Sequence, residues 1–128
     1  RLKPFRTFTE KGIHWAGGSD YSVTPFPARY SLWSSVARTT LNGTYGAQPF
    51  GTRESADVKT ALRAQTIWAA HQMFLDDRIG SIEIGKEADI AVWEQDLIRA
   101  PVNVLKDLKC VLTLLKGNIV YRDTQRLP

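Results

Sequence analysis

The hydrophobic pattern changes its period near residue 76, and this change limits the folds that the chain can adopt. Before that point, apolar residues recur at helical spacing over residues 28–41 and 54–75. After it, short β-branched runs alternate with glycines. Spacings of three and four residues favour helices, whereas short alternating runs favour strands. We therefore expect a strand followed by helices over residues 1 to about 75, and a β-rich region from Ile79 onward.

Two helices are expected in the first region. The first spans Ala28 to Leu41 and should pack its apolar stripe against a flat surface. The second spans Glu54 to Leu75, with Thr52 or Ser55 as its candidate N-cap. From Ile67 onward it is apolar nearly all round, so we expect it to be covered on several sides. The stripe of the first helix consists of Leu32, Trp33, Val36, Ala37 and Leu41.

The β-rich region is predicted to begin with short strands from Ile79 and to end in a hairpin. Residues 108–122, LKCVLTLLKGNIVYR, form two apolar runs joined at Lys116, Gly117 and Asn118. Glycine and asparagine tolerate positive φ, so this pair favours a tight turn. The segment between Pro101 and Asp107 is expected to be a short helical turn or a loop.

Composition excludes several classes of function. The 17 Lys and Arg residues exceed the 13 Asp and Glu residues by four, and the charges are scattered along the chain. A nucleic-acid partner is therefore not expected. No apolar run approaches the roughly 20 residues of a membrane span, and the opening RLKPFRTF is not a secretory signal. Because the chain begins at Arg1, we expect it to be a piece of a longer protein.

The single cysteine, Cys110, has no partner for an intramolecular disulfide. It lies beside the apolar run that begins at Val111, and free cysteines are among the most buried residues. We therefore interpret it as a small core residue. An unpaired cysteine also favours a reducing, cytoplasmic location.

A candidate site lies where the first apolar run ends. The run from Ile13 to Ala16 predicts a short buried strand, and GGSDYSVTP follows from Gly17 to Pro25. A strand, small residues, a carboxylate and then a helix is the arrangement of a βα unit in a barrel, where the strand ends carry the chemistry. The glycines allow backbone or ligand to approach closely. From the residues alone, Asp20 could serve a site, or it could bond its own backbone near Ser22.

Four segments, taken in order, resemble the C-terminal portion of the metal-dependent amidohydrolase superfamily. The resemblance is closest to amidohydrolase family 3, which includes N-substituted formamide deformylase-like enzymes, and it runs from about Gly12 to Tyr121. Any one of these motifs is weak, but the ordered set is specific. The segments are GGSDYSVTPFP, Val36-Ala37-Arg38, IGSIEIGKEADIAVWEQDL and VLTLLKGNIVY.

The resemblance implies a fold and a reaction. Residues 1–76 would form the last strand and closing helices of a TIM-type (β/α)8 barrel. Residues 77–128 would form the C-terminal share of a small composite β-sandwich. The implied enzyme cleaves non-peptide amide C–N bonds of a small-molecule substrate with a metal-activated water. Its divalent metal, with zinc favoured, would contact Asp20, which would also accept a proton. Tyr21 and Ser22 are candidates for substrate contacts.

The same comparison indicates what this chain lacks. The family pattern needs several histidines on earlier strands, and here there are only His14, within the expected strand, and His71, on the expected buried half of the second helix. We interpret both as structural, and we expect the isolated chain to be inactive. Arg38 could reach an acidic substrate group or simply be solvated. Asp89 is expected to serve the turn after Gly85 and Lys86. The tryptophans Trp15, Trp33, Trp68 and Trp93 are expected in the core.

Three hypotheses remain from the sequence. The chain is the C-terminal part of a hydrolase, a small non-catalytic binding or scaffold domain, or part of an inactive relative that has lost its metal ligands. A barrel removes its sheet edges only when it is closed, so a piece cut from one leaves backbone and apolar faces uncovered. We therefore expect the isolated chain to self-associate.

Overall fold

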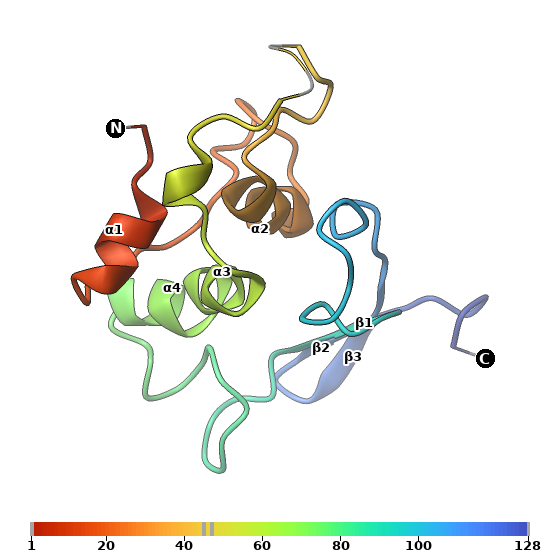
Figure 1. Cartoon of the computed structure of the whole chain (residues 1–128). Coiled ribbons are helices and arrows are strands. Elements are labelled where there is room, and N and C mark those ends of the chain that lie inside the picture. The colour runs from red at the N-terminus through yellow and green to blue at the C-terminus, as the bar shows by residue number, and fades with distance from the viewer. Residues whose placement is uncertain (1, 45, 47, 128) are drawn as a thin grey trace.

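A computed structural model of the chain describes residues 2–44, 46 and 48–127. Helices form one side of the molecule and a small sheet lies on the other (Figure 1). The helical elements precede the strands, as the change of period predicts. In order they are α1 (Phe5–Glu10), α2 (Ala28–Ala37), the 3-10 turn η1 (Thr52–Glu54), α3 (Val58–Gln65), α4 (Ile67–Gln72), β1 (Ile90–Trp93), β2 (Cys110–Leu115) and β3 (Asn118–Arg122).

Helix α2 ends at Ala37, four residues before the expected end at Leu41. Arg38 adopts the left-handed conformation, with φ 58° and ψ 31°, and its N–H donates to the Ser34 carbonyl at 3.0 Å. A left-handed residue stops a helix because it turns the chain away from the helical path. The Arg38 carbonyl then accepts a hydrogen bond from the Phe50 N–H at 2.7 Å, so the two ends of the following loop meet.

The second expected helix is divided into η1, α3 and α4. The N-cap of α3 is Asp57, and not Thr52 or Ser55: the Asp57 carboxylate accepts from the Thr60 N–H at 2.9 Å. Partial burial raises the pKa of Asp57, but its hydrogen bonds to the Thr60 hydroxyl and to backbone N–H groups outweigh that and lower the pKa. Thr66, which separates α3 from α4, has φ −129° and ψ −100°. This backbone cannot continue a helix.

The expectation that α4 is covered on several sides is wrong for its C-terminal end. Met73 and Phe74 are 55% and 89% exposed. Phe74 has φ 57°, so the chain leaves the helix there and directs the phenyl ring outward instead of into the core. Ala70, one turn earlier, is buried.

The sheet is antiparallel in the order β1-β2-β3, with Ile90 opposite Leu114 and Leu114 opposite Ile119. The predicted hairpin is confirmed. Its turn residues are Lys116 (φ 51°) and Gly117 (φ 80°), whereas Asn118 already belongs to β3. Two successive positive φ values match the right-handed twist of the flanking strands. The strands expected from Ile79 begin only at Ile90, because residues 79–89 form a series of turns.

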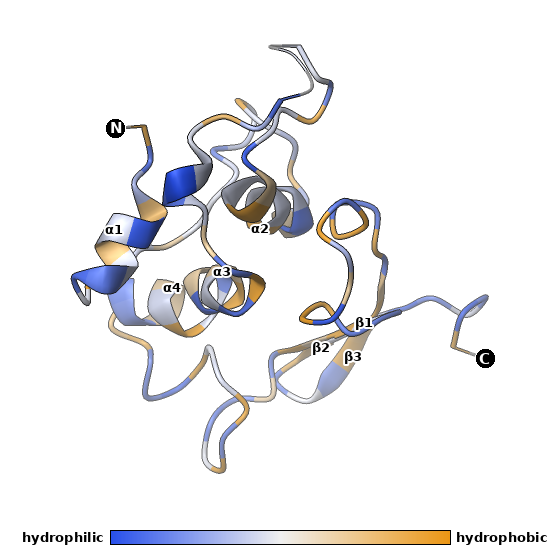
Figure 2. Ribbon diagram, viewed as in Figure 1, coloured by the Kyte–Doolittle hydropathy of each residue, from blue (hydrophilic) through white to orange (hydrophobic). Residues whose placement is uncertain are grey.

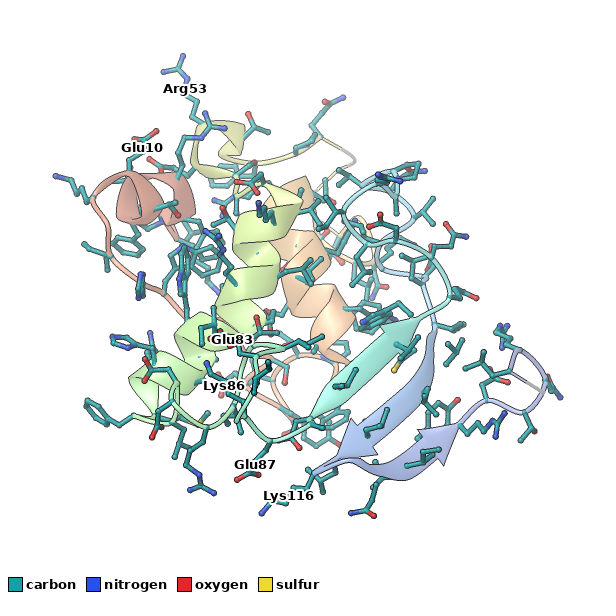
Figure 3. The ribbon with its side chains drawn as sticks, turned by 90° about the horizontal axis from the view of Figure 1, so that it is seen from below. Glu10, Arg53, Glu83, Lys86, Glu87 and Lys116 are labelled. Atoms are coloured by element: carbon teal, nitrogen blue, oxygen red, sulfur yellow. The ribbon has the colours of Figure 1, made fainter. Side chains whose placement is uncertain are left out.

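Those turns are held by half-buried polar groups. The Lys86 Nζ donates to the Asp76 carbonyl at 2.5 Å and to the Ser81 hydroxyl at 2.6 Å, and Glu83 lies beside it (Figure 3). Asp89 does not serve the Gly85–Lys86 turn as expected. Its carboxylate accepts from the Lys116 N–H at 2.8 Å, so it fixes the hairpin turn 27 residues away.

One hydrophobic core joins the helices to the segment between β1 and β2. Figure 2 shows hydrophobic residues both on the helices and on that segment. The tryptophan prediction is confirmed: Trp15 and Trp33 are buried in this core, and Trp68 and Trp93 pack against it. Cys110 lies half-buried on β2. The buried members are Trp15, Leu32, Trp33, Ala56, Ala61, Ala64, Leu97, Leu105 and Leu108.

Within the described ranges, no helix has the length and hydropathy needed to cross a membrane.

Candidate functional site

The segment that carries the candidate site has no regular secondary structure. The strand expected at Ile13–Ala16 is not formed, since the strands of the described residues all lie between Ile90 and Arg122. A strand needs a neighbouring strand for its backbone hydrogen bonds. Here the backbone bonds to a helix instead: the Gly17 N–H donates to the Ala64 carbonyl at the end of α3, at 3.0 Å.

Gly17 lies against the Gln65 side chain, which would have to move to admit a Cβ here. A Cβ at this position would lie 1.9 Å from Gln65 Nε2, well inside van der Waals contact. That amide nitrogen donates to the Ser31 hydroxyl at 2.9 Å, so α2, α3 and the Gly17 segment are tied together at one point. A Cβ at Gly18 would meet nothing within 4 Å. The first of the two glycines therefore packs, and the second leaves open space beside Asp20.

Asp20 is placed with its carboxylate free. The residue has φ 50°, and its carbonyl, not its side chain, accepts the turn-closing hydrogen bond from the Val23 N–H at 2.7 Å. Among the described residues, the exposed carboxylate has no hydrogen-bond or ion-pair partner. The interpretation in which the carboxylate bonds its own backbone near Ser22 is therefore not seen. A free carboxylate is available to an external group.

Asp20 lines a cavity of about 780 Å³. This lies within the range of roughly 300–1,000 Å³ that is typical of small-molecule sites. The cavity extends from the Asp20 segment along α2 to the loop that ends at Phe50. Other parts of its wall come from Trp15, Val23, Trp33, Arg38 and Phe50.

The two candidates for substrate contacts lie outside this cavity. Tyr21 is 72% exposed, and its ring packs edge-to-face on Phe26 with 5.9 Å between centroids. Ser22 is also exposed. Neither side chain lines the cavity, so the structure brings Asp20 to the cavity without them.

Arg38 is half-buried, and its guanidinium is bonded to the protein instead of being free to reach an acidic group. Its guanidinium donates to three backbone carbonyls, those of Leu2 (2.9 Å), Lys3 (3.3 Å) and Phe50 (3.2 Å). It also lies over the Phe5 ring, 5.4 Å from the centroid. Arg38 therefore clamps the N-terminal segment and the Phe50 loop to the end of α2.

The two histidines meet on the surface, and His71 is exposed instead of buried as expected. His14 stacks on Trp68 with 4.8 Å between ring centroids and lies edge-to-face with His71 at 5.3 Å. His71 Nδ1 is 3.3 Å from an Asp76 oxygen, and this hydrogen bond lowers the pKa of Asp76. The histidines do not line the cavity of Asp20.

The described residues do not form a metal centre. They contain no group of three or more His, Cys, Asp or Glu side chains that could hold an ion. A catalytic zinc needs about three protein ligands and a water. Asp20 supplies one carboxylate, so the residues of this chain do not fit a metal by themselves.

Local sequence patterns could not identify the cavity wall. Phe50 reaches the site only through the backbone hydrogen bond with Arg38 and the clamp around it. Trp33 was expected in the core, but its Nε1 is buried without a hydrogen-bond partner among the described residues, and the side chain lines the cavity. The position of a tryptophan on an apolar helical stripe does not indicate whether it also lines a cavity.

Comparison with known proteins finds a common family. The model of the amidohydrolase family matches residues 1–121. N-substituted formamide deformylase from Arthrobacter pascens is 29% identical over 97% of this chain. The putative amidohydrolase YtcJ from Bacillus subtilis is 28% identical over 94% of it. The chain spans 22% of the length of each of these relatives, about a fifth.

A shorter match and a solved structure extend this result. A 5-methylthioadenosine/S-adenosylhomocysteine deaminase from Thermodesulfovibrio yellowstonii is 50% identical over 36 residues, which are 28% of this chain and 8% of the deaminase. The crystal structure of an amidohydrolase from Thermotoga maritima superimposes with a TM-score of 0.69 at 23% identity. That match covers 94% of this chain and 26% of the solved one, and it shows a shared fold.

Proposed function

The chain belongs to the amidohydrolase family, and we propose that it is the C-terminal part of a metal-dependent hydrolase of non-peptide amide C–N bonds. The names of the relatives support this reaction class, since one is a formamide deformylase and another a deaminase. The substrate would be a small-molecule amide. The length of the relatives supports the proposal that the natural polypeptide is several times longer than 128 residues.

The observation that carries the proposal is the free carboxylate of Asp20 at the wall of a ligand-sized cavity. A carboxylate that lines a concave pocket and has no protein partner is available to a water, a metal or a substrate. A Cβ at Gly17 would displace the Gln65 side chain and one at Gly18 would meet nothing within 4 Å, so the segment before Asp20 is packed at the first glycine and open at the second.

We assign the two regions to the parts of the family fold. Residues 1–76 would be the last strand and closing helices of a (β/α)8 barrel, and residues 77–128 the C-terminal share of a β-sandwich. In this assignment Ile13–Ala16 pairs with barrel strands from outside this chain. Asp20 then stands at the carboxyl end of that strand, where barrel enzymes carry their chemistry.

The divalent metal, with zinc favoured, would depend on ligands outside this chain. Asp20 would add its carboxylate to such a site. When bound, a divalent ion supplies a water that is readily deprotonated near neutral pH. Asp20 would accept a proton and return it to the leaving amine, as a general base and then a general acid. Tyr21 and Ser22 would contact substrate only from outside the cavity.

The isolated 128-residue chain is expected to hydrolyse no amide and to self-associate. It lacks a complete ligand set, and large apolar side chains such as Phe74 and Ile84 are exposed at 89% and 108%. All residues of the edge strand β3 are exposed as well, so its free edge can pair with a second copy. Hydrolysis of formamides with added zinc, together with the mass from light scattering, tests both statements.

The natural polypeptide, assayed at the same molar concentration, is the control. Hydrolysis by the natural polypeptide and none by the isolated chain supports the proposal. Hydrolysis by the isolated chain with micromolar zinc would show that the missing ligands are not needed. A monomer at working concentrations would contradict the self-association.

A further inference from the structure

We propose that the cavity beside Asp20 is a subsite for an uncharged, apolar substituent of the substrate, an inference that rests on the proposed hydrolase function. At one end of the cavity stands the carboxylate that would serve the scissile amide. Serine and threonine hydroxyls contribute to the rest of the wall, but its apolar surface is larger than its polar surface. A substituent attached to that amide would therefore lie against hydrophobic surface.

Within this chain, the large apolar side chains of the wall stand at two depths. Phe50 is 69% exposed and Val23 is 77% exposed, although both are large apolar residues. Trp15 and Trp33 are buried in the core and contribute to the deeper wall. An apolar group that enters the cavity removes water from the exposed side chains, and removal of water from apolar surface favours binding.

The charged residues of the wall do not provide a ready partner for an acidic substituent. The donors of Arg38 are directed to the carbonyls of Leu2, Lys3 and Phe50. A carboxylate could recruit this guanidinium only by breaking those hydrogen bonds. Lys3 is at the exposed rim, where solvent screens its charge. The Asp20 carboxylate would also repel an anion.

Arg38 also fixes the position of the Phe50 wall. Its carbonyl accepts from the Phe50 N–H, and its guanidinium Nε donates to the Phe50 carbonyl at 3.2 Å. Both polar groups of the Phe50 backbone therefore bond to one residue at the end of α2. The Phe50 backbone is held without any contribution from its side chain, so Phe50 can be truncated while the loop is retained.

Three formamides test the subsite on the natural polypeptide with its metal: N-methylformamide, N-butylformamide and the anionic N-formyl-β-alanine. We expect kcat/KM for the butyl compound to exceed that of the methyl compound at least tenfold, since a single methylene in an apolar pocket gives about tenfold or more. Phe50→Ala should lower the butyl value about tenfold through KM and change the methyl value less than twofold. Phe74→Ala, an equal truncation outside the cavity, should change neither value.

A binding measurement separates this inference from the proposed reaction. N-Butylmethanesulfonamide has the same substituent but no hydrolysable amide, and the fluorescence of Trp15 and Trp33 should report its binding. If no amide is hydrolysed but the sulfonamide binds, and binds about tenfold more weakly to Phe50→Ala, the reaction is wrong and the subsite stands. No sulfonamide binding, equal effects of Phe50→Ala on both formamides, or preference for N-formyl-β-alanine would overturn the subsite.

Discussion

Replacing Asp20 with asparagine in the natural polypeptide is expected to lower kcat/KM for amide hydrolysis by a factor of about 10² to 10⁴, the range that general acid–base catalysis contributes. Asparagine keeps the size of the side chain but cannot accept and return the proton. It also tolerates the left-handed backbone that Asp20 adopts at φ 50°. Because the carboxylate has no partner among the described residues, the free energy of unfolding should change little. Steady-state kinetics and a denaturant titration measure the two effects.

Asp77→Asn is the matched control, since it removes an equal charge from an exposed residue outside the cavity. It should leave both kcat/KM and the denaturation midpoint unchanged. If Asp20→Asn keeps more than half of the wild-type kcat/KM, Asp20 does not carry the proton. If it unfolds the protein, the carboxylate serves the fold.

Replacing Gly80 with alanine is expected to destabilise the chain by about 2–4 kcal/mol, the sum of a positive-φ penalty and an overpacking cost. Gly80 has φ +91°, and a Cβ there would lie 2.8 Å from the Ala70 Cβ and 2.9 Å from the Ile67 Cα. These are atoms of α4 that cannot rotate away. The turn must therefore separate from the helix, which would loosen the attachment of the β-rich region. Urea denaturation followed by tryptophan fluorescence measures the loss.

Gly85→Ala separates the two causes of that loss. Gly85 has φ +96°, almost the same backbone conformation, but a Cβ there would meet nothing within 4 Å. It should therefore cost only about 1 kcal/mol, the conformational part. Equal losses for the two variants would show that the contact between Gly80 and α4 contributes nothing.

Local patterns predicted the elements that depend on local chemistry. The hairpin at Lys116 and Gly117, the start of α2 and the order of helices before strands follow from residues that are neighbours in sequence. The end of α2 could not be predicted in this way. Nothing in the apolar stripe through Leu41 marks Arg38 as left-handed, and its conformation is stabilised by carbonyls from Leu2, Lys3 and Phe50.

For the candidate site, too, the local sequence predicts one part and tertiary packing determines the other. Asp20 was identified because a run of small residues and a carboxylate follow an apolar segment, a pattern contained within eight residues. The cavity wall combines α2, the Phe50 loop and the N-terminal segment, and it exists only after these have packed. The sequence predicts a buried position for His71 because the helical pattern continues through Thr66. In the structure the helix is interrupted at Thr66, and the interruption changes which face of the following turn points to the core.

The measurement that tests the central claim most directly is the mass of the natural polypeptide, detected in its source cells through this segment. A mass several times 14.4 kDa is expected, since the chain spans 22% of its relatives and a complete barrel alone takes about 250 residues. A mass near 14.4 kDa would contradict the proposal that this chain completes a longer hydrolase. The family membership would then record ancestry, and the cavity beside Asp20 would belong to a binding domain.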